Sequence, residues 1–324
     1  MTFRPDTLPD LKGKVYIVTG GNSSIGYYTV AHLSEHGAHV YLCSRSQEKG
    51  NAAIADIKKM YPLKDVNIDL LQMDLMDLAS VVSAANRFLS LETALHGLIN
   101  NAGIMATPFE MTKDGHEAQW QTNYLSHWVL TELLLPLMLR TSTDKSLPPG
   151  SVRIVNLTSS GHLGAPKGGI NFDDPSLKEG GPWQRYGQSK LANILHARTL
   201  NKKYGPASAS ALNGEGEIWV SCVHPGLVET NLANTVTETG SSLMKVFPIA
   251  RMVGLTFTAD KGSWSSLFGV ASRDMKAEQS GMYFEVFKRL GEPWWQSGAA
   301  KDAKLAEKLD VWTKEIMSKE GRVQ

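Results

Sequence analysis

The chain has 324 residues, of which 42% are hydrophobic and 20% are charged, so it is long and apolar enough to bury a large core. Its 33 basic and 32 acidic residues leave a formal net charge of +1. No cluster of Lys and Arg interrupts this balance along the sequence. The composition therefore argues against nucleic acid or an anionic membrane surface as a partner.

Cysteine usage and the apolar segments indicate the compartment. Cys43 and Cys222 each fall inside an apolar, strand-like run, as expected for buried thiols in a reducing environment. The first ten residues contain no apolar signal-peptide segment. The longest apolar stretch, Leu133 to Leu139, is too short to span a bilayer. We expect a cytoplasmic protein without a membrane span.

Short apolar runs alternate with helical patterns along the chain. The expected strands cover Val15 to Val18, Val40 to Cys43, Val66 to Met73, Leu98 to Ile99, Val152 to Leu157, Ile218 to Val223 and Met282 to Val286. A helix from Ile25 to His36 follows the first strand and ends at Gly37. Strands this apolar are buried on both faces. The pattern predicts a doubly wound (Rossmann) α/β fold with a parallel sheet of about seven strands in a three-layer αβα arrangement.

The βα pattern has no linker-like break, so we expect one domain over residues 1–324. Segments 141–150 and 205–217 are rich in Ser, Pro, Gly or Ala and are expected to be surface insertions. Segment 227–260 contains many apolar residues and suits an apolar lid over a binding site, although a helical core segment is equally compatible. Leu305, Leu309, Trp312 and Ile316 repeat at helical spacing, which predicts a C-terminal amphipathic helix over about 299–319.

Tyr186 and Lys190 are four residues apart, so on a helix they share one face. A neighbouring cation favours the phenolate and moves the pKa of the phenol toward the range where it exchanges a proton at neutral pH. Ser159 follows an expected strand and supplies a hydroxyl that can hold a carbonyl oxygen. Together the three side chains suit the interconversion of an alcohol and a carbonyl. Alone, the Tyr–Lys spacing is common on solvent-exposed helices.

A glycine-rich turn joins the first expected strand to the first helix. It reads Thr19-Gly20-Gly21-Asn22-Ser23-Ser24-Ile25-Gly26. Backbone N–H groups in such a turn, together with the helix N-terminus, can bind a pyrophosphate. An ordinary strand-to-helix turn is the alternative.

With these motifs in place, the chain resembles the short-chain dehydrogenase/reductase family from Lys14 to about Val286, in its retinol-dehydrogenase-like branch with many fungal members. The matching residues occur in family order. They are the glycine-rich turn, Asp74, Asn101-Ala102-Gly103, Asn123, Ser159, Tyr186 with Lys190, and Pro225-Gly226. Ser24 departs from the family pattern, because a glycine is usual at that position.

The resemblance implies four catalytic residues. Ser159 would hydrogen-bond the developing alkoxide, and Tyr186 would exchange the proton. Lys190 would lower the pKa of the phenol and bind the nicotinamide ribose. Asn123 would hold a water in a proton relay to Lys190. Ser160 is the alternative to Ser159, and Asn123 alone also fits a polar group inside a helix.

The resemblance also implies a set of cofactor-binding residues. They are Gly20, Asn22, Ser24, Ile25, Gly26, Asp74, Asn101, Ala102, Gly103, Pro225 and Gly226, together with Tyr186 and Lys190. Asp74 would contact the adenine edge, Asn101 would steady the adenosine side, and Pro225-Gly226 would lie against the nicotinamide. Taken singly, Asp74 also fits a helix cap and Asn101 a turn residue.

The end of the second expected strand indicates which cofactor is used. An NAD-selective site places a carboxylate near this point to accept from the ribose 2′-hydroxyl. Ser44 stands there instead, and Arg45 follows with a guanidinium suited to a 2′-phosphate. We therefore expect NADP(H), with a surface arginine as the alternative.

Two other classes of function compete. His32 and Glu35-His36 match an inverted zinc-protease pattern, which would make the protein a zinc hydrolase through His32 and His36. A non-catalytic NADP-binding regulator is the second alternative. We expect no metal, and a small-molecule substrate that is a bulky, mostly apolar carbonyl compound or alcohol. The resemblance leaves a homodimer and a monomer both open.

Overall fold

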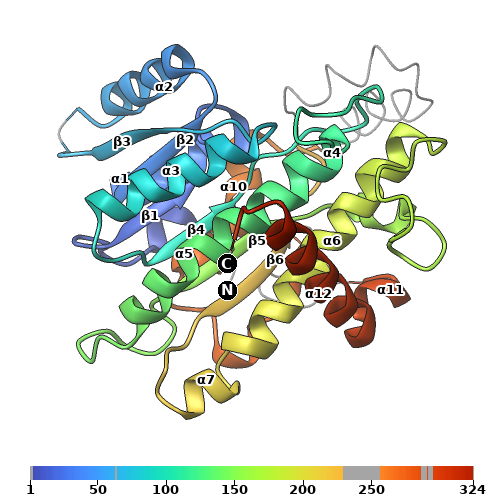
Figure 1. Ribbon diagram of the computed structural model, residues 1–324. Coiled ribbons are helices and arrows are strands. Elements are labelled where there is room, and N and C mark those ends of the chain that lie inside the picture. Colours follow the sequence, from blue (N-terminus) through green and yellow to red (C-terminus); the bar gives the residue numbers. More distant parts are fainter. Residues whose placement is uncertain (1–2, 63, 229–255, 286–289, 291–294, 324) are drawn as a thin grey trace.

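The computed structural model describes residues 3–62, 64–228, 256–285, 290 and 295–323. Its centre is a sheet of seven parallel strands in the order β3-β2-β1-β4-β5-β6-β7 (Figure 1). The strands are β1 (Val15–Val18), β2 (His39–Ser44), β3 (Asn67–Gln72), β4 (Gly97–Asn100), β5 (Arg153–Leu157), β6 (Trp219–His224) and β7 (Tyr283–Glu285). The chain direction across the sheet reverses between β1 and β4, the point at which ligands bind in doubly wound folds.

Helices cover both faces of the sheet. The longer ones are α1 (Ser24–Glu35), α2 (Gln47–Met60), α3 (Leu78–Leu91), α5 (Ser126–Ser142), α6 (Pro182–Tyr204), α10 (Ala259–Ala271) and α12 (Ala303–Lys319). The shorter ones are α4 (Ala118–Trp120), α7 (Ala209–Leu212), α11 (Gly298–Lys301), the 3₁₀ helices η1 (Pro5–Thr7), η3 (Ser160–Gly164) and η5 (Ala277–Gln279), and the π-helix η2 (Gln121–Leu125).

Two apolar clusters fill the spaces between these layers. One joins α3, α5, α6 and α12 to one face of the sheet, and the other joins α1, α2 and α10 to the opposite face. All four residues of β1 and of β4 are buried, as expected for strands with a helix layer on each side. The predicted fold class is therefore confirmed.

The predicted strands and first helix are confirmed, with ends that differ by no more than one residue. Val286, the expected end of the last strand, lies outside the described residues. Gly37 has φ +90°, the left-handed conformation that glycine adopts when it ends a helix. The first predicted insertion overlaps the end of α5, and the second contains α7, which the sequence did not indicate.

The C-terminal helix forms as two pieces, because Asp302 interrupts α11 and then caps α12 with its side chain. Helix α12 lies against α6 (Figure 1), with Leu309 among its buried residues.

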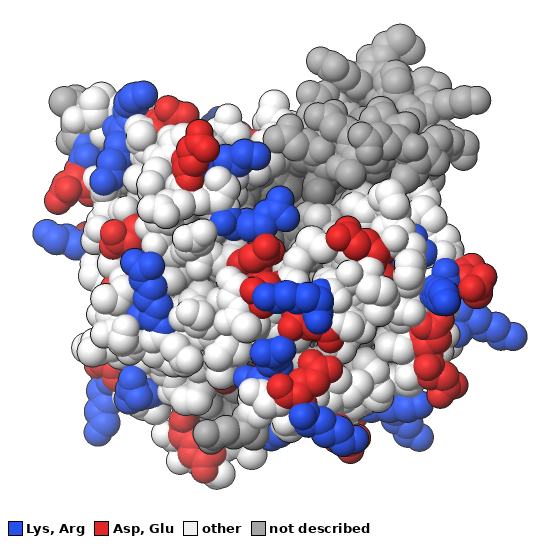
Figure 2. All heavy atoms as spheres, turned by 45° about the horizontal axis from the view of Figure 1, so that its top comes forward, with Lys and Arg blue, Asp and Glu red and all other residues white. Residues whose placement is uncertain are grey.

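The predicted lid over 227–260 falls largely on residues 229–255, which lie outside the described residues. Of its flanks, Val228 pairs with Phe257 in an isolated parallel bridge, and α10 begins at Ala259. Figure 2 shows basic and acidic residues interspersed over the face drawn, which agrees with the near-balanced composition. None of the helices within the described ranges has the length and hydropathy needed to cross a membrane.

Candidate active site

The three expected catalytic side chains meet at the carboxyl end of β5. Ser159 lies two residues past the strand and caps η3, where its hydroxyl accepts from the N–H of Gly161 at 3.0 Å. Helix α6 brings Tyr186 and Lys190 to the same place, with exposed fractions of only 7% and 5%. A Cβ on Gly161 would stand 2.7 Å from the Tyr186 ring and 3.3 Å from the Ser159 hydroxyl, so this glycine lets the two side chains approach.

The lysine and the tyrosine are both removed from water. The Lys190 ammonium lies 5.7 Å from the centre of the Tyr186 ring and donates to the carbonyl oxygen of Leu157 at 3.2 Å. Burial lowers the pKa of Lys190 to about 8. Burial also raises the pKa of Tyr186 to about 12, opposed by a hydrogen bond with Ser159. Burial is the main cause of this shift and leaves the phenol protonated at neutral pH, while a lowering of its pKa by Lys190 stays a prediction.

Asn123 lies in the π-helical turn η2 that joins α4 to α5. Its side-chain oxygen accepts from the N–H of Ile104 at 2.8 Å, and its amide nitrogen donates to the carbonyl of Ile104 and to the hydroxyl of Ser189, both at 2.9 Å. A Cβ on Gly103 would lie 3.0 Å from the Asn123 oxygen and 3.3 Å from the Lys190 nitrogen. Asn123 and Lys190 therefore border the same glycine, while the water relay between them stays a prediction.

A histidine connects Asn123 to the end of β1. The Nδ1 atom of His127 lies 3.1 Å from the carbonyl oxygen of Asn123, which can only accept, so Nδ1 carries the proton. Its Nε2 atom then accepts from the hydroxyl of Thr19 at 2.8 Å. Burial lowers the pKa of His127 to about 3, which keeps the ring neutral. The Thr19 oxygen in turn accepts from the N–H groups of Asn101 and Ala102, both at 2.9 Å.

The glycine-rich turn packs closely against the start of α1. A Cβ on Gly26 would lie 2.3 Å from the carbonyl oxygen of Gly20 and 2.6 Å from the side-chain nitrogen of Asn101, so no larger residue fits. That nitrogen donates to the carbonyl of Thr19 at 2.7 Å. Ile25 packs into the apolar cluster shared with α10, so its backbone is what remains for a ligand.

Ser24 stands in the turn with φ +51°, a conformation that costs a non-glycine residue free energy. Its hydroxyl oxygen is buried and has no hydrogen-bond partner within the described part of the chain. A strained residue with an orphaned hydroxyl at the N-terminus of α1 fits a site that donates to a phosphate oxygen.

A cavity of about 290 Å³ opens beside this turn, at the carboxyl ends of β1, β2 and β4. Its lining includes the expected residues Gly20, Asn22, Arg45, Asp74, Ala102 and Gly103. Lys49 joins Arg45 at the wall near β2, and Asp74 is the one carboxylate among the lining residues. Asp77, not Asp74, caps α3. The carboxylate of Asp74 accepts instead from the N–H of Met76 at 2.9 Å.

Pro225 and Gly226 follow β6 directly, with Gly226 at φ +82°, so the turn leaves the sheet at the same edge as Ser159. At the opposite end of α1, the Nε2 atom of His32 lies 2.7 Å from the carboxylate of Asp260 in α10. Within the described ranges, no three or more His, Cys, Asp or Glu residues are grouped to hold a metal ion.

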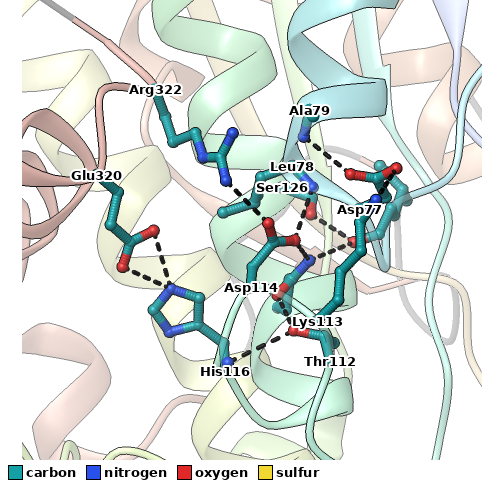
Figure 3. A network of polar contacts seen from close by, with 12 residues as sticks. Asp77, Leu78, Ala79, Thr112, Lys113, Asp114, His116, Ser126, Glu320 and Arg322 are labelled. Carbon is teal, nitrogen blue, oxygen red and sulfur yellow. Dashed lines mark hydrogen bonds and ion pairs between the residues drawn. The ribbon is translucent and has the colours of Figure 1, made fainter.

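A network of polar contacts fastens the C-terminus to the helix that carries Asn123 (Figure 3). The carboxylate of Asp114 accepts from Arg322 at 2.9 Å, and from the N–H of Leu78 and the amide of Gln121, both at 2.8 Å. His116 contacts Glu320 at 2.9 Å. Gln121 begins the π-helical turn, so the residues after α12 help to set where that turn lies.

Sequence reasoning missed His127, Thr19 and Lys49 as parts of the site. His127 follows Asn123 at helical spacing, and Lys49 follows Arg45 by the same interval, so both intervals were readable in the sequence. Thr19 was noted only as the first residue of the glycine-rich turn. Its role depends on the contacts across β1 and β4, which a single sequence does not show.

Several known proteins are similar to this chain in sequence or in fold. Residues 14–170 match the family model described as short chain dehydrogenase. The chain is 49% identical over 321 residues to the short-chain dehydrogenase/reductase drtF of Aspergillus calidoustus, covering 97% of each protein. It is 40% identical over 290 residues to the uncharacterized oxidoreductase C736.13 of Schizosaccharomyces pombe, covering 88% of this chain and 80% of that protein.

The fold also matches a crystal structure of a putative uncharacterized protein from Mycobacterium paratuberculosis, with TM-score 0.71, 28% identity and 98% of each chain covered. Identity to the Aspergillus protein extends over nearly the whole of both chains. The protein therefore belongs to the short-chain dehydrogenase/reductase family of oxidoreductases.

Proposed function

We propose that this protein uses NADP(H) to interconvert a carbonyl and an alcohol on a bulky, mostly apolar substrate, with Tyr186 as the general acid and base. The observation that carries the proposal is the meeting of buried Tyr186 and Lys190 with partly exposed Ser159 at the carboxyl edge of the sheet. That edge is where doubly wound folds bind their ligands.

In the proposed mechanism, the Ser159 hydroxyl donates to the carbonyl oxygen of the substrate and fixes its position beside Tyr186. The phenol, protonated at neutral pH, donates its proton to the same oxygen as negative charge develops there. The Lys190 ammonium, held by the Leu157 carbonyl, stabilises the phenolate that remains. NADP(H), when bound, supplies or accepts the hydride.

The residues around the 290 Å³ cavity fit a dinucleotide with a 2′-phosphate. Arg45 and Lys49 place two cations at the end of β2, where an NAD-selective site has a carboxylate. Asp74 in the cavity wall suits the adenine amino group. Ser24 does not line this cavity, but its orphaned hydroxyl at the N-terminus of α1 suits the pyrophosphate.

Apolar side chains flank the catalytic residues. Trp183 packs edge-on against the Tyr186 ring, with ring centres 6.2 Å apart. Leu163 of η3 and Leu227 after Gly226 are 44% and 36% exposed and so offer apolar surface to a ligand. A bulky, mostly apolar substrate would cover them, gaining affinity mainly from the apolar area buried.

Replacing Tyr186 with Phe should lower turnover by roughly 10²–10⁴-fold, the usual contribution of a positioned acid or base. NADPH affinity should change little, because only the hydroxyl is removed. Steady-state kinetics and NADPH titration measure the two quantities. The control is Tyr204→Phe, which makes the same change at the far end of α6. Turnover of Tyr186→Phe close to wild type would reject Tyr186 as the acid.

Replacing Arg45 with Asp should shift preference from NADPH toward NADH. The substitution exchanges a partner of the 2′-phosphate for a like charge that can accept from a 2′-hydroxyl. Losing a hydrogen bond to a charged group costs about 1.5–3 kcal/mol, so the ratio of the two kcat/KM values should fall at least ~10-fold. Arg87→Asp, on the exposed side of α3, makes the same charge change outside the cavity. An unchanged ratio in Arg45→Asp would show that Arg45 is an ordinary surface residue.

Replacing Ser24 with Gly should have opposite effects on folding and on cofactor binding. Glycine adopts φ +51° without strain, so the free energy of unfolding should rise by up to ~1 kcal/mol. Loss of the hydroxyl should weaken NADPH binding by about 1.5–3 kcal/mol. Denaturant unfolding and NADPH titration separate the two effects. Tighter NADPH binding in the glycine variant would mean that the serine side chain crowds the cofactor.

A panel of carbonyl compounds graded by size and polarity tests the substrate class. With NADPH in excess, kcat/KM should rise with apolar surface and be lowest for small hydrophilic aldehydes and sugars. A clear preference for small hydrophilic carbonyls would refute the apolar pocket, while Tyr186→Phe tests the catalytic assignment separately.

A further inference from the structure

A second cavity lies at the amino ends of the strands, on the edge of the sheet opposite the catalytic residues. Its volume is about 450 Å³. Lys14 immediately precedes β1, and Arg153 and Trp219 are the first residues of β5 and β6, so all three enter the cavity from strand starts. The proposed reaction makes no use of this edge.

Arg153 is a buried guanidinium held only by neutral groups among the described residues. It is 8% exposed. Its Nε atom donates to the carbonyl of Gly150 at 2.6 Å, and Nη1 donates to the carbonyls of Ser272 at 2.9 Å and Gly269 at 3.4 Å, with the Met275 sulfur 3.6 Å away. The guanidinium also lies over the Trp219 ring, 5.2 Å from its centre.

Lys14 adds a second half-buried cation to the same cavity. Its pKa is lowered by burial and by the charge of Arg153, which also acts on the phenol of Tyr16 in the cavity wall. Burial lowers the pKa of Arg153 to about 10. In the part of the chain described, neither cation forms an ion pair with a carboxylate. Asp10 also lines the cavity, but its carboxylate accepts from the backbone of Lys12 at 3.0 Å.

Two neighbouring cations without a counter-ion repel one another, and each loses hydration on burial. An anion between them would offset both costs. A third basic residue, Arg273, lines the cavity from an exposed position. The apolar part of the wall includes Leu11, Pro149 and Val270, with the Trp219 ring beside the guanidinium. Such walls favour an apolar or aromatic body attached to the charged group.

We infer that this cavity binds a small organic anion, a carboxylate or phosphate ester carrying an apolar group, through Lys14 and Arg153. The site is separate from the cofactor cavity, with which it shares none of its lining residues.

Titration calorimetry at constant ionic strength tests the inference with phenyl phosphate, benzoate, inorganic phosphate and phenol. The two organic anions should bind with one saturable site. Inorganic phosphate should bind at least several-fold more weakly than phenyl phosphate, and phenol should not bind. Equal affinity for inorganic and phenyl phosphate would refute the role of the apolar walls.

Variants assign the binding to one cavity. Lys14→Gln should weaken phenyl phosphate binding roughly ten-fold, the scale of one hydrogen bond to a charged group. Lys12→Gln, an exposed neighbour outside the cavity lining, and Arg45→Gln, in the cofactor cavity, should leave the affinity within about two-fold of wild type. Affinity retained in Lys14→Gln, affinity lost in Arg45→Gln instead, or no saturable binding in the wild type would each overturn the inference.

Discussion

The packing of α6 against β5 and β6 is the constraint on which the proposed chemistry depends. It places the ammonium of Lys190 where only the carbonyl of Leu157 accepts from it among the described residues. An ammonium in such a place holds its proton less firmly, which is why its pKa falls to about 8. The same burial keeps the phenol of Tyr186 protonated. Excluding water therefore leaves Lys190 as a poorly screened cation and Tyr186 as a protonated phenol.

The positions of these groups are held by contacts that run across the sheet. The His127 ring hydrogen-bonds to both the Asn123 carbonyl and the Thr19 hydroxyl. The Thr19 oxygen also accepts from the N–H groups of Asn101 and Ala102, which follow β4. The π-helical turn matters here, because it brings the Asn123 side chain onto both backbone groups of Ile104. π-Helical turns cost helix stability and occur often at functional sites. The C-terminal contacts of Arg322 and Glu320 support the same turn from outside the sheet (Figure 3).

The fold and the meeting of Ser159, Tyr186 and Lys190 were largely predictable from the sequence. Strands such as Val15–Val18 are buried on both faces, so nearly all their residues must be apolar, and such runs are easy to recognise in the sequence. The Tyr186–Lys190 spacing specifies one helix face whatever the surroundings. The rise in the pKa of Tyr186 on burial was not predictable, because it depends on packing from distant segments. Neither was the contact of His32 with Asp260, which joins residues far apart in the chain.

The pH dependence of carbonyl reduction tests most directly whether buried Tyr186 and Lys190 act together. With NADPH saturating, kcat/KM should stay level through neutral pH, where both groups carry their protons, and then fall as pH rises through about 8, where Lys190 loses its charge. This loss of activity should occur at a lower pH than the titration of the Tyr186 phenol, whose pKa is about 12. A rate that rises through pH 8 would contradict the account, because it would mean that reduction requires the deprotonated forms of these groups.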